Sequence, residues 1–202
     1  MTNLEVEVKF YLEDIRDARN RIVKAGAVFE KKERENNLRL EDEHFSLIKS
    51  GALLRLRQTD GKTLLTYKGK VAHPAAGCKV YDEREVTVSD LDEMTNILAF
   101  IGFRPVQRYE KIRETWRLEG ALICLDEMPY GNFIEIEGEP GIIRKIAEIT
   151  GFEWKNRILT NYLAIFEKLK EKFNLDFNDV TFDNFKGVEI DFKKCLDMFV
   201  AG

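Results

Sequence analysis

The chain has 202 residues, of which 44% are hydrophobic and 34% are charged, and its formal net charge at pH 7 is −4. This length supports one large domain with a packed core, or one domain with an appendage. The mild acidic balance and the lack of a basic block argue against a nucleic-acid polymer as the ligand.

The N-terminus and the cysteine content predict a cytoplasmic protein. Met1 to Glu5 contain no cationic segment leading into an apolar run, so we expect no signal peptide, and no apolar stretch reaches the length of a membrane-spanning helix. Cys78, Cys124 and Cys195 are odd in number, and no two are spaced as Cys-x-x-Cys. This pattern favours free structural thiols over disulfides or a thiolate zinc site.

The first half of the chain predicts a strand, a helix and four further strands. Residues 3–11 read as a strand, and residues 13–25 carry apolar side chains at helical spacing and end before Gly26. Strand-like runs then fit residues 27–33, 36–41, 52–59 and 62–68, and Asp60-Gly61 forms the turn of a hairpin between the last two. Residues 69–78 are rich in turn formers and predict an exposed loop.

The second half predicts more strands and three helices. Residues 79–88 form a strand, after which Ser89 is expected to cap a helix from Asp90 to Ile101, followed by Gly102. Further strands fit residues 104–118, 121–126 and 132–138, and helices fit residues 140–150 and 158–172. This order indicates an antiparallel α+β architecture with enough strands to curl into a barrel.

Charged residues recur two apart in five of these segments, mostly with apolar neighbours, and a sixth segment adds the acid Asp126. Side chains alternate across a strand, so each pair lies on one face. The pairs are mostly sorted into acids only or bases only, which predicts a polar barrel interior, with apolar residues such as Val8 and Leu56 facing helices outside. For any single pair, the alternative to an interior position is a solvent-exposed face of the sheet. The segments are Glu5 to Lys9, Arg55 to Arg57, Glu83 to Glu85, Lys111 to Arg113, Leu125-Asp126 and Glu135 to Glu137.

The acidic members of these segments predict a divalent metal site. Hard oxygen ligands without His or Cys suit Mg²⁺ or Mn²⁺ rather than zinc. His44 and His73 fall in expected loops and lack ligand spacing, so a zinc hydrolase or a Ser-His-Asp hydrolase is not supported. The acids that would gather if their strands are neighbours are Glu5, Glu7, Glu83, Glu85, Asp126, Glu135 and Glu137.

The basic members predict a site for a polyphosphate. Arginine binds phosphate oxygens through two N–H groups and lysine acts as a point charge, so the set could hold a polyphosphate along its length. Phosphoryl transfer needs mainly alignment and charge neutralisation, and metal-activated hydrolysis of a terminal phosphate is its simplest outcome. A network of salt bridges is the alternative, but burying so many ions without a ligand is costly. The basic set is Lys9, Arg55, Arg57, Lys68, Lys111 and Arg113.

These motifs resemble the CYTH family, also called triphosphate tunnel metalloenzymes. Its hallmark Glu-x-Glu-x-Lys opens the chain at 5–9, and the match continues through Leu-Arg-Leu-Arg at 54–57, Thr-Tyr-Lys-Gly at 66–69, Glu-Arg-Glu at 83–85, Lys-x-Arg at 111–113, Leu-Asp-Glu at 125–127 and Phe-Ile-Glu-Ile-Glu at 133–137. The resemblance implies a closed tunnel of eight antiparallel strands with flanking helices. Residues 1–172 would form this domain, and residues 173–202 a Phe-rich C-terminal appendage.

The resemblance also implies roles for individual residues. We expect Lys9, Arg57, Lys68 and Asp126 to be catalytic, and the divalent ion to be Mg²⁺ or Mn²⁺. The phosphates would be bound by Lys9, Arg55, Arg57, Lys68, Lys111 and Arg113. The metal would be bound by Glu5, Glu7, Glu83, Glu85, Glu135 and Glu137.

Three functions remain open at this point. We predict a metal-dependent triphosphatase that hydrolyses the terminal phosphate of a small molecule such as ATP, tripolyphosphate or thiamine triphosphate. A class IV adenylyl cyclase, which makes cyclic AMP and pyrophosphate, is the alternative, although the His-Phe pair of such cyclases does not precede Glu5 here. The Tyr of thiamine triphosphatases is also missing from residues 36–42, and a non-catalytic polyphosphate binder is the third option. The Phe-rich tail could pack on the barrel, act as a lid or form a homodimer contact.

Overall fold

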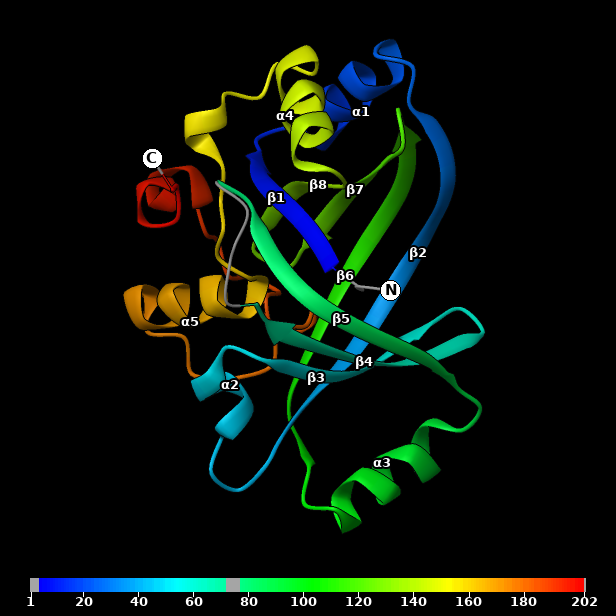
Figure 1. Cartoon of the computed structure of the whole chain (residues 1–202). Helices are drawn as coiled ribbons and strands as arrows, with labels where there is room; N and C mark the ends of the chain where they lie inside the picture. Colours follow the sequence, from blue (N-terminus) through cyan, green and yellow to red (C-terminus); the bar gives the residue numbers. More distant parts are fainter. Residues whose placement is uncertain (1–3, 72–76, 202) are drawn as a thin grey trace.

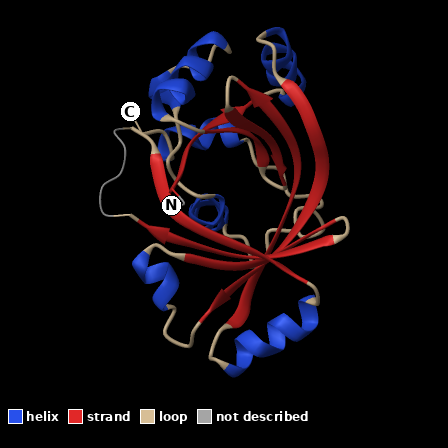
Figure 2. Cartoon of the chain, turned by 45° about the vertical axis from the view of Figure 1, so that its right-hand side comes forward, coloured by secondary structure: helices blue, strands red, loops and turns tan. Residues whose placement is uncertain are grey.

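The computed structural model describes residues 4–71 and 77–201. Eight antiparallel strands form a closed barrel in the order β1-β5-β4-β3-β2-β6-β7-β8, and helices flank it (Figures 1 and 2). The predicted antiparallel α+β barrel is therefore confirmed. The strands are β1 (Leu4–Leu12), β2 (Val28–Glu41), β3 (Leu53–Thr59), β4 (Lys62–Lys70), β5 (Lys79–Val88), β6 (Arg104–Leu118), β7 (Ala121–Met128) and β8 (Gly131–Glu137).

Strand β2 differs from its prediction. The sequence predicted two runs, residues 27–33 and 36–41, with Arg34 and Glu35 between them. The structure has one strand, which pairs with β6 almost throughout its length and places Glu35 opposite Lys111. Backbone pairing to a long neighbour therefore carries the strand through its polar centre. The predicted loop also begins later, since β4 extends to Lys70, and His73 lies outside the described residues.

The helix ends show two further corrections. Helix α3 (Leu91–Phe100) is capped by Asp90 and not by Ser89, because the Asp90 carboxylate accepts a hydrogen bond from the Glu93 backbone N–H at 2.9 Å. Helix α5 (Tyr162–Phe173) begins later than the predicted residue 158. Ile158 instead donates its backbone N–H to the Lys9 carbonyl at 2.7 Å, which holds this segment against β1.

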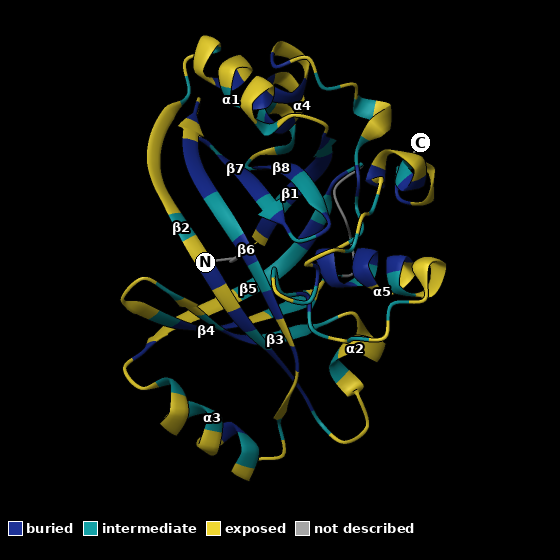
Figure 3. Ribbon diagram, turned by 180° about the vertical axis from the view of Figure 1, so that it is seen from behind, coloured by how far each residue is buried: buried dark blue, intermediate teal, exposed yellow. Residues whose placement is uncertain are grey.

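Helices cover the outer face of the barrel. Helices α1 (Ile15–Lys24) and α4 (Pro140–Ile149) pack against β1, β7 and β8, where Val8 and Phe10 are buried with Ile22 and Ile146. Helix α3 lies over a second apolar cluster that contains Leu56. Figure 3 shows the buried residues concentrated where these elements meet. The apolar core therefore lies outside the barrel, as predicted, which leaves the interior for polar groups.

The chain after α5 packs on the barrel and on α5. Val180 bridges to β6: the Glu110 N–H donates to its carbonyl at 2.9 Å, and its own N–H donates to the Arg108 carbonyl at 2.8 Å. Phe192 and Phe199 are buried, with ring centres 5.3 Å apart. Packing on the barrel, one of the three roles considered for the tail, is thus observed. The remaining short elements are α2 (Ser46–Ser50), η1 (Trp154–Asn156) and η2 (Phe192–Met198).

Among the described residues, no helix is both long enough and apolar enough to cross a membrane.

Candidate functional site

The barrel interior holds a cavity of about 1010 Å³. Its wall combines carboxylates with lysine and arginine side chains that come from seven of the eight strands. All predicted site residues except Asp126 line it: Glu5, Glu7, Lys9, Arg55, Arg57, Lys68, Glu83, Glu85, Lys111, Arg113, Glu135 and Glu137.

The strand register explains why these residues meet. Lys9 lies opposite Glu135 where β1 pairs with β8, and Glu7 lies opposite Glu137 two residues away. Lys68 on β4 is likewise opposite Glu83 on β5. Because residues two apart share a face, each charged pair in the sequence enters the interior together with the pair on the neighbouring strand.

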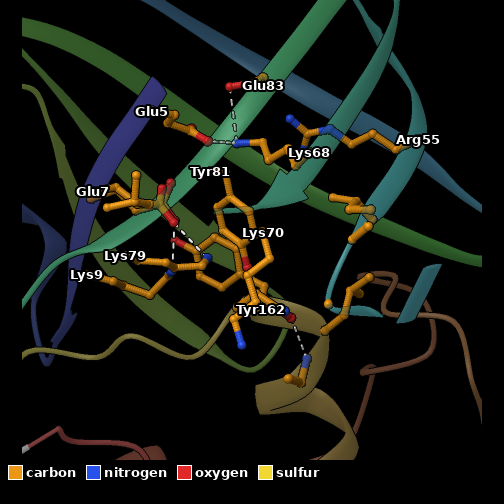
Figure 4. A pocket seen from close by; sticks show the side chains of 18 of the residues that line it. Glu5, Glu7, Lys9, Arg55, Lys68, Lys70, Lys79, Tyr81, Glu83 and Tyr162 are labelled. Carbon is orange, nitrogen blue, oxygen red and sulfur yellow. Dashed lines mark hydrogen bonds and ion pairs between the residues drawn. The ribbon is translucent and has the colours of Figure 1, made fainter. Parts of the chain in front are cut away.

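Several acids on one side of the cavity pair with lysines. The Lys9 Nζ is 2.8 Å from Glu135 Oε1, and Lys79 Nζ is 2.8 Å from Glu7 Oε1. Figure 4 shows Lys68 pointing between two acids: it pairs with Glu5 and lies 3.4 Å from Glu83 Oε2. A salt-bridge network, the alternative that the sequence left open, is therefore present in part.

These pairs hold two of the carboxylates ionised. Burial alone would raise the pKa of Glu7, but Lys79 lowers it to about 2. Burial likewise opposes ionisation of Glu135, yet Lys9 and Arg113 hold its pKa well below the ordinary value. Glu7 and Glu135 are therefore charged at neutral pH.

Two other carboxylates experience the opposite effect. Burial, and then the nearby Glu5 carboxylate, raise the pKa of Glu137 to about 7. The pKa of Glu5 is raised by its burial and by the charges of Glu7 and Glu83, although Lys68 acts against them. Burial, reinforced by neighbouring carboxylates, thus opposes ionisation of Glu5 and Glu137.

This acidic side fits a hard divalent cation. Its donors are all carboxylate oxygens, and a cation would stabilise the charged forms of Glu5 and Glu137, which burial and the neighbouring carboxylates disfavour. Within residues 4–71 and 77–201, however, no three His, Cys, Asp or Glu side chains are already gathered as a metal cage. Ligation would require carboxylates such as Glu5 and Glu7 to turn from their lysine partners.

The part of the wall formed by β3 and β6 is the cationic side, and it meets the acidic side where Arg113 pairs with Glu135. Arg55 Nη1 donates to the Tyr109 hydroxyl at 2.9 Å, and Arg57 Nη2 donates to Glu85 Oε2 at 3.3 Å. Glu85 also accepts a hydrogen bond from the Thr66 hydroxyl at 2.9 Å, and it is more exposed than the other acids. Glu85 therefore faces the arginine side rather than the carboxylates around Glu5.

Asp126 lies behind the cavity wall, fully buried. Its oxygens accept from Arg113 Nε at 2.6 Å and Nη2 at 2.5 Å, from Lys111 Nζ at 3.3 Å and from the Tyr162 hydroxyl at 2.8 Å. Asp126, which the sequence predicted to be catalytic, therefore lies outside the cavity lining and orients the two cations.

Sequence reasoning missed several lining residues. Lys79 and Tyr81 share the interior face of β5 with Glu83, so strand alternation alone could have identified them. Lys70 was assigned to a loop, although its strand extends that far. Tyr162, at the start of α5, had no signal in the charge pattern. Glu35, a buried acid that does not line the cavity, fell between two predicted strands.

Comparison with known proteins gives a consistent result. The model of the CYTH domain matches residues 3–159. A protein of Methanocaldococcus jannaschii, whose name proposes an adenylate cyclase, is 27% identical over 167 residues, which are 82% of this chain and 89% of that protein.

Solved structures share the fold. A Pyrococcus horikoshii protein is 28% identical with a TM-score of 0.68, covering 82% of this chain and 99% of its own. A Vibrio parahaemolyticus protein has a TM-score of 0.70 at 19% identity, covering 83% and 99%. A Hippeastrum protein, described as an adenylyl cyclase candidate with a dominant triphosphatase activity, has a TM-score of 0.60 at 18% identity, covering 82% and 95%.

Proposed function

The chain belongs to the CYTH domain family, and from this premise we propose that it is a metal-dependent triphosphatase that removes the terminal phosphate of a small triphosphate. The observation that carries the proposal is that one cavity gathers carboxylates around Glu5 and Glu137 together with cations around Arg57 and Lys111. A polyphosphate needs cations along its oxygens, and hydrolysis needs a metal near the phosphorus that is attacked.

The lysines and arginines of the wall would bind and align the phosphates. Arg57 on β3 presents a planar guanidinium to the cavity. Lys111 and Arg113 add positive charge from β6, which pairs with β2. These cations would stabilise the charge that shifts onto the phosphate oxygens during transfer. Asp126 and Tyr162 keep Lys111 and Arg113 oriented toward the phosphates.

The carboxylates Glu5, Glu7, Glu135 and Glu137, with Glu83 nearby, would hold Mg²⁺ or Mn²⁺. Such an ion, when bound, would neutralise phosphate charge and lower the pKa of a water molecule that can attack the phosphorus. The exchange of lysine partners for a metal would free Lys68 and Lys79 to meet phosphate oxygens instead. Metal and triphosphate would in this way bind cooperatively.

A class IV adenylyl cyclase is the second candidate, favoured by the name of the Methanocaldococcus relative. The two reactions differ in the atom that is attacked: a cyclase directs the ribose 3′-oxygen at the α-phosphorus, and a hydrolase directs water at the terminal one. The triphosphatase activity described for the Hippeastrum protein supports the hydrolase. We also propose a cytoplasmic location, which the three free, buried cysteines support.

Product analysis separates the candidates. Tripolyphosphate, ATP, GTP and thiamine triphosphate would each be incubated with Mg²⁺ or Mn²⁺, and phosphate, pyrophosphate and cyclic nucleotide would be measured in the same samples. Phosphate release from one or more substrates is the expected result. Cyclic AMP with stoichiometric pyrophosphate from ATP would identify a cyclase, and tight binding without any product would identify a non-catalytic binder.

A further inference from the structure

Glu35 is a buried acid within the cationic side of the cavity. It lies on β2 with its side chain fully buried, opposite Lys111 in the β2–β6 register. Its Oε1 is 3.6 Å from Arg57 Nη1 and 3.9 Å from Arg113 Nε, and its Oε2 is 3.6 Å from Lys111 Nζ. All three cations line the cavity, whereas Glu35 lies behind them.

These contacts are ion pairs without hydrogen bonds. Within the described part of the chain, neither Glu35 oxygen has a partner in hydrogen-bond geometry, although the nearby Asn37 side chain also lowers the pKa of Glu35, and the buried Arg57 Nε has no partner either. The contrast with Asp126 is clear, because Asp126 takes two N–H groups of Arg113 at 2.5 and 2.6 Å. Glu35 therefore contributes charge to the cation cluster without occupying the donors that a phosphate would use.

The cluster needs such a charge. Burial and the charge of Arg113 both oppose the charge on Lys111, but the carboxylates of Asp126, Glu35 and Glu135 outweigh them and raise the pKa of Lys111. Burial would also raise the pKa of Glu35, but Lys111 and Arg113 lower it, which keeps the carboxylate ionised. A fixed negative charge below 4 Å from three cations reduces their attraction for any anion in the cavity.

We propose that Glu35 is a positioning residue that sets the affinity of the tunnel for phosphate anions, acting as a permanent counter-ion behind Arg57, Lys111 and Arg113. This inference rests on the proposed triphosphate site. Because Glu35 is outside the cavity wall, a bound triphosphate does not displace it. The cations then bind the substrate with part of their charge already offset, which allows the phosphate product to leave.

The test is a binding measurement that needs no turnover. Tripolyphosphate would be titrated into wild type and Glu35→Gln by calorimetry in EDTA, with folding checked by circular dichroism. Glu35→Gln keeps the shape and removes the charge, and we expect it to bind tripolyphosphate about ten-fold more tightly. Glu35→Asp, which keeps the charge, should bind within about three-fold of wild type. With metal present, Glu35→Gln should show a lower KM together with a lower kcat.

Glu33→Gln is the matched control. Glu33 lies two residues away on the same face of β2, and its ion pair is with the exposed Lys31. The affinity of the Glu33→Gln variant for tripolyphosphate should equal that of wild type. The inference would be overturned if folded Glu35→Gln bound tripolyphosphate as tightly as wild type or more weakly. It would also be overturned if neither protein bound tripolyphosphate. Failure of the proposed function would appear separately, as tight binding without metal-dependent phosphate release.

Discussion

The ammonium group of Lys9 lies over the ring of Tyr162, 4.1 Å from its centre. This contact joins the first strand of the barrel to the first residue of α5. The same ring is 5.5 Å from Lys111 Nζ, and its hydroxyl donates to Asp126 at 2.8 Å. One aromatic residue thus contacts two of the expected phosphate-binding lysines and the acid that orients one of them.

We predict that Tyr162 has separable ring and hydroxyl contributions. Tyr162→Phe removes only the hydrogen bond to Asp126 and should lower kcat by roughly ten-fold. Tyr162→Leu also removes the ring beneath Lys9 and Lys111 and should lower kcat further. Steady-state kinetics with tripolyphosphate, alongside thermal melting, measures both. Equal kinetics for wild type and folded Tyr162→Leu would show that Tyr162 serves packing alone.

The positions of Tyr162 and Glu35 could not be predicted from the sequence, whereas most of the site could. The interior acids and bases were predictable because alternating charges in a strand identify its face, and all but Asp126 line the cavity. Tyr162 was not predictable, since its position depends on where α5 begins. Ile158 pairs with Lys9, and Asn161 caps the helix by accepting from the Ala164 N–H at 2.8 Å. Periodicity alone placed the helix start four residues too early.

Glu35 was missed for a different reason. Local propensity divided β2 at Arg34 and Glu35, whereas continuous pairing with β6 determines the strand. The fold class was predictable because it depends on patterns that repeat in every strand. The contacts around Glu35 depend on which strands become neighbours. In the closed barrel β2 lies between β3 and β6, and no local sequence pattern predicts that order.

Arg57 should be essential for the chemical step. Arg57→Ala removes a guanidinium from the cationic side and should lower kcat by about 10²-fold or more if Arg57 contacts the transferring phosphate. Arg57→Lys keeps the charge but loses the planar pair of N–H donors, so we expect only partial recovery. Both variants would be compared under single-turnover conditions. Wild-type rates in Arg57→Ala would remove Arg57 from the phosphate site.

The raised pKa of Glu137 predicts a pH-dependent stability. Burial and the charge of Glu5 raise this pKa from 4.5 to about 7, so between these pH values the folded chain binds a proton that the unfolded chain has lost. This group therefore lowers the stability of the metal-free protein as the pH rises from 4.5 to 7, and the loss is complete above that range.

Glu137→Gln should remove this effect. In EDTA at pH 8 the variant should melt roughly 2–4 °C above wild type, and the difference should vanish below pH 4. Mg²⁺ should raise the melting temperature of wild type more than that of the variant, because the variant has lost a charged ligand. A higher melting temperature of wild type at pH 8 in EDTA would contradict the account of Glu137.

Tyr81 should distinguish organic from inorganic substrates. Its ring lines the cavity beside Lys79, whose Nζ is 4.9 Å from the ring centre, and Figure 4 shows it among the labelled residues of the site. A cavity of about 1010 Å³ has room for more than three phosphates. Tyr81→Leu should raise the KM for ATP several-fold and leave the KM for tripolyphosphate unchanged. Equal changes for both substrates would place Tyr81 at the phosphates instead.

The most direct test of the account is phosphate release from tripolyphosphate as a function of Mg²⁺ or Mn²⁺, measured for wild type and for Glu7→Gln. We predict that wild type releases phosphate and pyrophosphate only with metal, that EDTA abolishes the release, and that Glu7→Gln remains folded and inactive. Turnover that persists in EDTA, or a fully active Glu7→Gln, would contradict a carboxylate-bound metal beside a cationic phosphate site.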